Sequence, residues 1–174
     1  SQKRNIKLFP KVNEKIANVI KKEFYDTVYT RANVTRSYPL KRTAAHVIGF
    51  VNSDRRGQHG IEYKYQDLLT MISDKLKPTD LFPKGTSIIL TIDSALQEFA
   101  EEELKQAAQK AKAERGTIIV MSPKTGEIYA WAVYPNYDPN IFYKEKYLKN
   151  WSITDIYQPG STFKVLTVSA ALEN

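Results

Sequence analysis

The chain has 174 residues, of which 26 are basic and 19 acidic, and its formal net charge is +7. A hydrophobic content of 42% and a charged content of 26% exclude a disordered or collagen-like chain and predict one or two globular domains. Cysteine is absent, which excludes disulfides and cysteine-based zinc sites, and the two histidines argue against a His-rich metal site. The sequence contains neither an apolar run of about 18 residues nor a signal-peptide pattern, so no membrane-spanning segment is predicted.

The basic excess lies in the N-terminal part of the chain. Residues 1–50 contain 11 basic and 3 acidic residues, a net charge of +8, whereas residues 51–174 contain 15 and 16, a net charge of −1. Such a charged end suits an anionic partner, either a nucleic acid or a lipid surface. The alternative is a solvated helix face without a specific partner.

The first half of the sequence predicts short elements of both kinds. Apolar residues at helical spacing predict an amphipathic helix over 11–24, and β-branched and aromatic residues predict an extended segment over 26–38. Further along, the patterns predict a short helix over 42–50, a polar loop over 52–60 and a helical stripe over 61–72.

The second half follows a Pro- and Gly-bearing segment, 73–85, which is the candidate linker between a region 1–80 and a domain 81–174. The patterns then predict a buried strand over 86–92, a helix from Asp93 or Ser94 to about 113, a β-hairpin over 117–121 and 128–133, a loop over 134–150 and a last helix from Pro159-Gly160. The predicted fold class is α+β. Because such a hairpin needs a larger sheet to bury its faces, we expect the chain to end part-way through its second domain.

The residues with the strongest catalytic potential are Ser161 and Lys164, which form a Ser-x-x-Lys pattern at the start of the last helix. Residues three apart share a helical face, so the Lys164 amine can reach the Ser161 hydroxyl and act as its base if burial lowers its basicity. The helix N-terminus adds positive potential near an attacked carbonyl. A capped helix with Lys164 in solvent is the alternative, but the apolar neighbours Phe163, Val165, Leu166 and Val168 favour a buried helix.

Other polar residues receive structural interpretations. His46, among apolar neighbours, is predicted to be a satisfied and partly buried histidine. Lys124-Thr125-Gly126 is predicted to be a turn, and Glu101-Glu102-Glu103 a solvated face. Gly57-Gln58-His59-Gly60 is predicted to be a tight loop before a helix, and Glu62 to be favourable to the dipole of that helix.

Several segments in the same order resemble class B penicillin-binding proteins, the monofunctional DD-transpeptidases of peptidoglycan synthesis. The segment Tyr157-Gln158-Pro159-Gly160-Ser161-Thr162-Phe163-Lys164 resembles their active-site segment. The other similar segments are Arg36-Ser37-Tyr38-Pro39, Ala45-His46-Val47-Ile48-Gly49-Phe50, Gly57-x-x-Gly60-x-Glu62, Leu90-Thr91-Ile92-Asp93-Ser94 with Leu96-Gln97, and Ser122-Pro123-Lys124-Thr125-Gly126-Glu127-Ile128. The similarity covers roughly residues 30–174.

This resemblance implies an N-terminal pedestal-type region followed by the opening of a transpeptidase domain. It also implies that Ser161 is the acylated nucleophile and an oxyanion-hole donor through its backbone N–H, and that Lys164 is the base partner. The implied substrates are peptidoglycan stem peptides ending in D-Ala-D-Ala, the implied inhibitors are β-lactams, and no cofactor is implied. The family's later Ser-x-Asn and Lys-Thr/Ser-Gly motifs are not found here, since Lys124-Thr125-Gly126 precedes Ser161, so the 174 residues alone are expected to be inactive.

The resemblance also implies a place and partners. It predicts the extracytoplasmic face of a bacterial membrane, an anchoring helix before residue 1, anionic lipid near the basic end, and cell-wall synthesis proteins, among them a glycosyltransferase, as partners; no nucleic acid is expected. Two alternatives remain open: a penicillin-sensing or non-catalytic scaffold relative, and a basic binding module in which Ser161 and Lys164 are incidental. A role in septation or in elongation is not distinguished.

Overall fold

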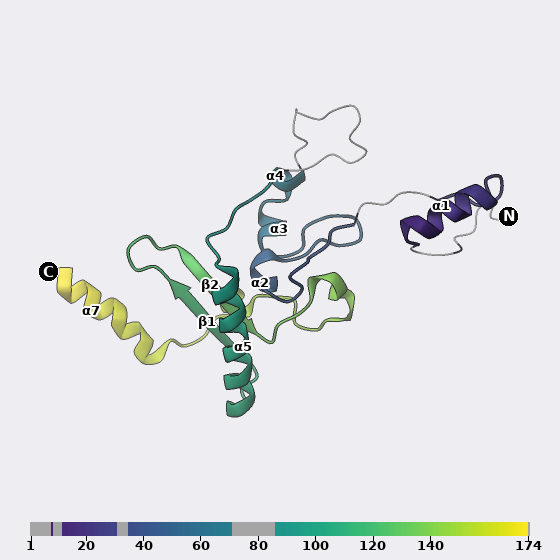
Figure 1. Ribbon diagram of the computed structural model, residues 1–174. Coiled ribbons are helices and arrows are strands. Elements are labelled where there is room, and N and C mark those ends of the chain that lie inside the picture. Colours follow the sequence, from purple (N-terminus) through teal and green to yellow (C-terminus); the bar gives the residue numbers. More distant parts are fainter. Residues whose placement is uncertain (1–7, 9–11, 31–34, 71–85, 174) are drawn as a thin grey trace. The chain divides into compact units, whose positions relative to one another are not determined.

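The computed structural model describes residue 8 and residues 12–30, 35–70 and 86–173. The chain divides into two compact units, Ser1–Thr35 and Arg36–Asn174. The predicted boundary at 73–85 lies outside the described residues, so the division into 1–80 and 81–174 stays a prediction. The fold contains helices and one antiparallel sheet, which confirms the α+β class (Figure 1).

The first unit contains helix α1, Glu14–Glu23, which confirms the helix predicted over 11–24. The Asn13 side chain caps its N-terminus by accepting a hydrogen bond from the Ile16 backbone N–H at 2.8 Å. The apolar stripe of the helix is exposed, at Val12, Ile16, Val19 and Phe24. Among the described residues of this unit, none covers the apolar stripe of the helix.

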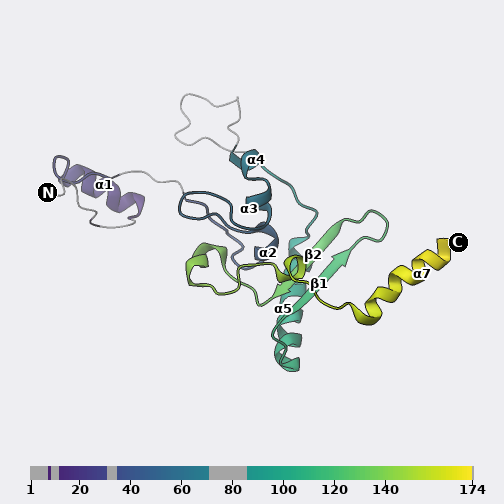
Figure 2. The same ribbon diagram turned by 180° about the vertical axis from the view of Figure 1, so that it is seen from behind.

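The centre of the second unit is a β-hairpin packed on a helix. Strands β1, Gly116–Met121, and β2, Ile128–Tyr134, pair antiparallel from Gly116 opposite Tyr134 to Met121 opposite Ile128, with a bulge near Met121. Helix α5, Ser94–Ala111, begins after Asp93, whose carboxylate accepts a hydrogen bond from the Leu96 N–H at 2.8 Å. It lies along one face of the hairpin in both views, with a shared core of Ala100, Leu104, Ala130 and Ala132 (Figures 1 and 2). The predicted helix and hairpin are confirmed.

The free edge of β2 is bonded by a side chain of α5 instead of by another strand. The fully buried Gln97 accepts a hydrogen bond from the Trp131 N–H at 2.6 Å and donates one to the Trp131 carbonyl at 2.9 Å. Nearby, the Asp93 N–H donates to the Tyr129 carbonyl at 2.9 Å. Because an unpaired strand edge needs such partners, Gln97 acts as a one-residue substitute for a neighbouring strand.

Residues 36–70 form a second, mainly helical part of this unit, with α2, Ala45–Ile48, α3, Gly60–Lys64, and α4, Gln66–Thr70. Two chain segments approach closely here: a Cβ at Gly60 would overlap the Val47 carbonyl oxygen, and one at Gly49 would overlap the His59 carbonyl. Both glycines have positive φ, +56° and +79°. The Gly57-x-x-Gly60-x-Glu62 segment thus lets two stretches of backbone pack closely before α3, which confirms the predicted tight loop.

Four predictions need correction. Residues 86–92 do not form a strand: Ile89 is exposed, and the Thr91 hydroxyl, not a backbone ladder, donates a hydrogen bond to the Ile128 carbonyl of β2. No strand lies in the described parts of 26–38, residues 26–30 and 35–38. The short helix predicted over 42–50 begins only at Ala45, as α2, whereas its end at Gly49 is where the sequence predicts it. The stripe over 61–72 is broken at Tyr65 into α3 and α4, as far as Thr70.

After β2 the chain forms four short helical elements, the last of which is helix α7. They are the 3-10 helix η1, Pro139–Lys144, helix α6, Trp151–Thr154, the 3-10 helix η2, Gly160–Phe163, and helix α7, Lys164–Glu173. The predicted loop over 134–150 therefore contains a helical turn. In the described parts of the chain, no helix has both the length and the apolar character needed to cross a bilayer.

Candidate active site

Ser161 lies in the one-turn helix η2, directly before α7. Gly160 begins this turn with φ +56°, a conformation that glycine adopts without steric cost. The Thr162 hydroxyl donates a hydrogen bond to the Pro159 carbonyl, and the Lys164 N–H donates to the Ser161 carbonyl. Local backbone bonds thus place Ser161 and Lys164 on successive turns at a helix start, as the sequence predicts.

The surroundings of this pair differ from the prediction of a buried helix. Val165, Leu166 and Val168 are 68%, 62% and 56% exposed, because no described element packs over them. Within the part of the chain that the structure describes, neither the Ser161 hydroxyl nor the Lys164 ammonium has a hydrogen-bond partner. The described residues therefore supply the Ser-x-x-Lys spacing but not the desolvation that would turn Lys164 into a base.

Helix α6, which precedes this segment, is fastened to the hairpin by its side chains. The Trp151 indole N–H donates to the Tyr134 carbonyl at 3.1 Å, and the Trp131 indole N–H donates to the Ser152 hydroxyl at 3.1 Å. Asp155, which ends α6, receives Arg115 Nη1 at 2.5 Å. We call these three contacts, made by Trp151, Ser152 and Asp155, the α6 anchor.

Asp155 is the charged part of the α6 anchor. Its second carboxylate oxygen accepts hydrogen bonds from Lys149 Nζ at 3.0 Å and from the Thr154 hydroxyl at 3.1 Å. Hydrogen bonds from Lys149 and Arg115 lower the pKa of Asp155 below its ordinary value. The guanidinium of Arg115 also lies 6.0 Å from the centroid of the Trp151 ring, and a cavity of about 290 Å³ opens beside these residues.

The C-terminal part of the chain matches a known family. The family "Penicillin binding protein transpeptidase domain" matches residues 116–174, which include the hairpin, the α6 anchor and Ser161. Residues 116–174 belong to the penicillin-binding protein transpeptidase family.

Related proteins extend the similarity over most of the chain. A peptidoglycan D,D-transpeptidase FtsI homolog of Chlorokybus atmophyticus is 40% identical over 79% of this chain and 23% of its own length. Escherichia coli FtsI is 32% identical over 98% of this chain and 32% of its own length. The chain therefore spans about a quarter to a third of the length of the curated relatives that it matches.

Solved structures agree with the sequence relatives. Penicillin-binding protein 3 of Mycobacterium tuberculosis superposes with a TM-score of 0.68 at 28% identity, over 80% of this chain and 31% of that one. Its crystal structures include complexes with aztreonam and with ampicillin. The resemblance to class B penicillin-binding proteins that the sequence motifs indicate is confirmed.

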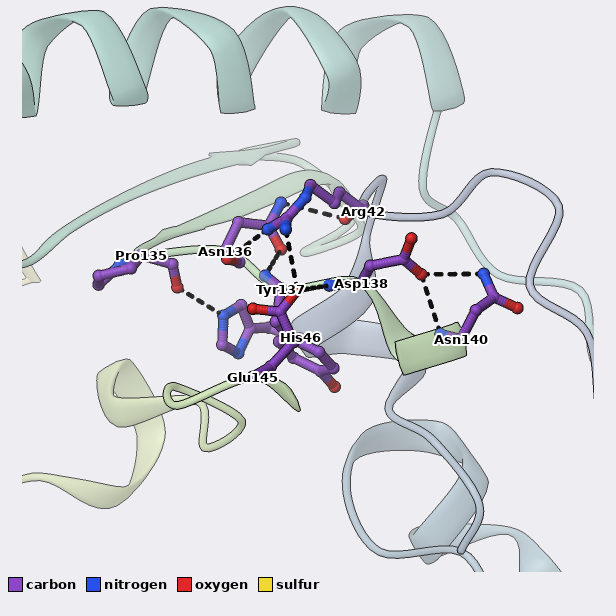
Figure 3. A network of polar contacts seen from close by, with 8 residues as sticks. All are labelled: Arg42, His46, Pro135, Asn136, Tyr137, Asp138, Asn140 and Glu145. Carbon is purple, nitrogen blue, oxygen red and sulfur yellow. Dashed lines mark hydrogen bonds and ion pairs between the residues drawn. The ribbon is translucent and has the colours of Figure 1, made fainter. Parts of the chain in front are cut away.

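A dense polar network joins residues 36–50 to residues 134–145, and we call it the junction (Figure 3). Arg42 donates to the Asn136 carbonyl and to the Glu145 carboxylate, both at 2.8 Å. The Asn140 side chain pairs with both backbone groups of Tyr38, at 3.0 and 2.9 Å. The junction therefore fixes the segment that follows β2 against the N-terminal half of the unit.

The apolar centre of the junction is the ring of Tyr137, which is fully buried. Its hydroxyl donates to the Ala45 carbonyl at 3.0 Å, and burial raises its pKa. His46 packs edge-on against this ring at 4.9 Å, and its Nε2 lies 2.9 Å from the Pro135 carbonyl. The predicted satisfied histidine is confirmed at Nε2, whereas the buried Nδ1 has no partner among the described residues. Burial lowers the pKa of His46.

Two carboxylates have larger structural roles than the sequence predicted. Glu101, taken for part of a solvated face, is half-buried and accepts hydrogen bonds from the Ala44 N–H at 2.9 Å and from Gln97 at 2.7 Å; burial raises its pKa. Glu62 is 4% exposed and pairs with Arg36 at 2.7 Å. The sequence signal for Glu101 was its position one helical turn after Gln97 on the same helix. For Glu62 the signal was its place in the Gly-x-x-Gly-x-Glu segment.

Proposed function

We propose that this chain is part of a peptidoglycan D,D-transpeptidase that works through a serine acyl-enzyme. The observation that carries the proposal is the Ser161-x-x-Lys164 pattern at the start of α7, inside the residues that match the transpeptidase family. Relatives named peptidoglycan D,D-transpeptidase that align with nearly the whole chain support the same activity.

In the proposed reaction the Ser161 hydroxyl oxygen attacks the carbonyl carbon of the penultimate D-Ala of a stem peptide. Lys164, as a neutral amine, takes the hydroxyl proton, and the backbone N–H of Ser161 donates to the carbonyl oxygen as it gains negative charge. The amide C–N bond then breaks, and D-Ala leaves with a proton on its nitrogen. The amine of a second stem then attacks the Ser161 ester, the ester C–O bond breaks as the cross-link amide forms, and the proton that the attacking amine loses passes to the serine oxygen.

This role requires that Lys164 lose much of its water contact in the whole protein. Transfer of the serine proton needs a neutral amine, and loss of water contact favours the neutral form of a lysine over the charged form. The exposed apolar side chains beside Lys164, among them Val165 and Val168, give α7 the character of a helix that other residues cover. We therefore propose that the catalytic state of Lys164 depends on residues outside the described part of the chain.

The experiment is penicillin labelling of the longest natural form of the protein, with the adduct mapped by peptide mass spectrometry. A β-lactam carbonyl is attacked by the same serine, so we expect one adduct, on Ser161, that is lost in Ser161→Ala. Ser169→Ala is the matched control, because Ser169 lies on the same helix with its hydroxyl bonded to the Val165 carbonyl at 2.9 Å. A folded full-length protein without a label would contradict the proposal.

The proposal also covers the domain organisation and the location of the protein. We propose that residues 1–80 form a pedestal-type region and residues 81–174 the start of the transpeptidase domain. We further propose that the protein acts at the outer face of the bacterial membrane, held by a helix outside this chain and assisted by cell-wall synthesis proteins. The first unit supports contact with anionic lipid, because residues 1–35 contain 8 basic and 3 acidic residues, a net charge of +5, and α1 exposes an apolar stripe.

A further inference from the structure

The α6 anchor is the last point at which the chain is fastened to the hairpin before Ser161. Ser161 follows Asp155 by six residues, a stretch that can span roughly 20 Å when fully extended. Ile156 and Tyr157 are exposed, and between residues 156 and 163 the hydrogen bonds of the described structure are local to the turn at Pro159. The position of Ser161 on the domain therefore depends on where α6 is held.

The ion pair between Arg115 and Asp155 attaches the end of α6 to the start of the hairpin. Arg115 lies directly before β1, so its pairing with Asp155 at 2.5 Å ties the end of α6 to the strand that begins the hairpin. The Asp155 N–H also donates to the Trp151 carbonyl at 2.9 Å, which ends α6 at this residue. Lys149 approaches the other oxygen of the same carboxylate, so Asp155 accepts from residues before α6 and before β1 together.

We propose that Asp155, held by Arg115, is a positioning residue for acylation of Ser161. It does not contact the reacting atoms; it sets the start of the 156–160 segment that carries the nucleophile. Because small displacements of a reacting group cost a large part of the rate, loss of this attachment should slow acylation more than it weakens binding of the acylating agent. The inference rests on the proposed function of Ser161.

The test measures penicillin acylation by rapid quench over a range of concentrations, in the longest natural form of the protein. For Asp155→Asn, which keeps the shape and removes the charge, we expect the acylation rate constant to fall about tenfold, with the penicillin dissociation constant changed less than about twofold. Arg115→Met should give the same split. The double variant should be no slower than the slower single variant, because each substitution alone already removes the ion pair between Arg115 and Asp155.

Asp54→Asn is the matched control, since Asp54 is an exposed aspartate whose carboxylate makes no ion pair in the described structure. It should leave the rate constant unchanged. Circular dichroism and thermal unfolding accompany each variant, because a merely structural role would lower stability and the labelled fraction without slowing the labelled molecules. If Asp155→Asn does not fold, Arg115→Lys takes its place: it keeps the charge and loses the fixed guanidinium geometry, and it should also slow acylation.

The outcomes separate this inference from the function on which it rests. Unchanged rate constants in folded Asp155→Asn and Arg115→Met, or effects that multiply in the double variant, would overturn the positioning role while Ser161 still labels. If the wild-type protein takes no label on Ser161, the proposed function itself fails.

Discussion

The junction and the Ser161 segment lie within one unit of the chain but are built in opposite ways. In the junction, buried rings and paired polar groups join residues 36–50 to residues 134–145, with Tyr137 fully buried at its centre. In the Ser161 segment the bonds are local and the apolar side chains of α7 are exposed. The difference teaches that the described residues bury the junction among themselves, whereas they leave the apolar side chains of α7 uncovered.

The comparison predicts that substitutions at buried or hydrogen-bonded residues lower the free energy of unfolding strongly, whereas those on α7 do not. The largest effect is expected for Gln97→Leu. It leaves the part-buried N–H and carbonyl of Trp131 without partners, and each unsatisfied group costs about 1–3 kcal/mol, so unfolding free energy should fall by about 2–6 kcal/mol. Urea unfolding measures it. Gln106→Leu on the exposed side of α5 is the control, and equal losses in both variants would contradict the edge-pairing role.

A backbone prediction follows from two glycines with similar φ but different surroundings. Gly60 has φ +56° and faces the Val47 carbonyl, whereas Gly126 has φ +76° and nothing within 4 Å of its missing Cβ. Gly126→Ala should cost about 1–2 kcal/mol of stability through its conformation alone. Gly60→Ala should cost about 2–4 kcal/mol, because the overlap adds to that strain. Similar melting temperatures for the two variants would show that the close approach is not tight.

His46 should make the junction sensitive to acid. Its folded pKa lies below the ordinary 6.5 because burial disfavours the charged ring, while the Pro135 hydrogen bond partly offsets this. Between the folded pKa and 6.5 the unfolded chain binds more protons, so stability is lost as pH falls through this window. Urea midpoints at several pH values should therefore drop more in wild type than in His46→Gln. Parallel pH profiles of wild type and His46→Gln would exclude this role. His59→Gln is the comparison variant, because burial also lowers the pKa of His59.

The smallest effect is expected on α7. Leu166 is 62% exposed, so Leu166→Ala in the 174-residue chain should change unfolding free energy by less than about 0.5 kcal/mol. The same substitution in the longest natural form should cost about 2–5 kcal/mol if the rest of the protein covers this helix. Thermal unfolding of the two forms side by side makes the measurement, and a small effect in both would mean that α7 stays uncovered.

Much of this architecture could be predicted from local pattern. The helix α5, with its Asp93 cap, and the hairpin around the turn at Gly126 follow from periodicity and turn chemistry, which act between near neighbours. The strand predicted over 86–92 was wrong because its apolar residues find no second strand to pair with in the described fold. Apolar composition alone does not distinguish a paired strand from an extended connection.

The candidate site could be predicted in its residues but not in its surroundings. The motif around Ser161 and Lys164 follows from spacing and resemblance. The prediction that α7 is buried rested on its composition. This prediction was wrong for the described residues, because burial depends on what packs against a helix. The role of Gln97 depends on a partner 34 residues away, and local sequence patterns contain no signal for this pairing. The Gly-x-x-Gly-x-Glu segment marks Glu62 as a residue of interest but does not identify its partner Arg36, 26 residues away.

The central claim is that Ser161 becomes an ester with a stem peptide. The most direct measurement incubates the longest natural form with a peptide ending in D-Ala-D-Ala, quenches with acid and determines the intact and peptide masses together with free D-Ala. We predict a transient adduct on the peptide that contains Ser161, at least an equal amount of released D-Ala, and neither product in Ser161→Ala. D-Ala release that persists in Ser161→Ala, or an adduct on another residue, would contradict the account.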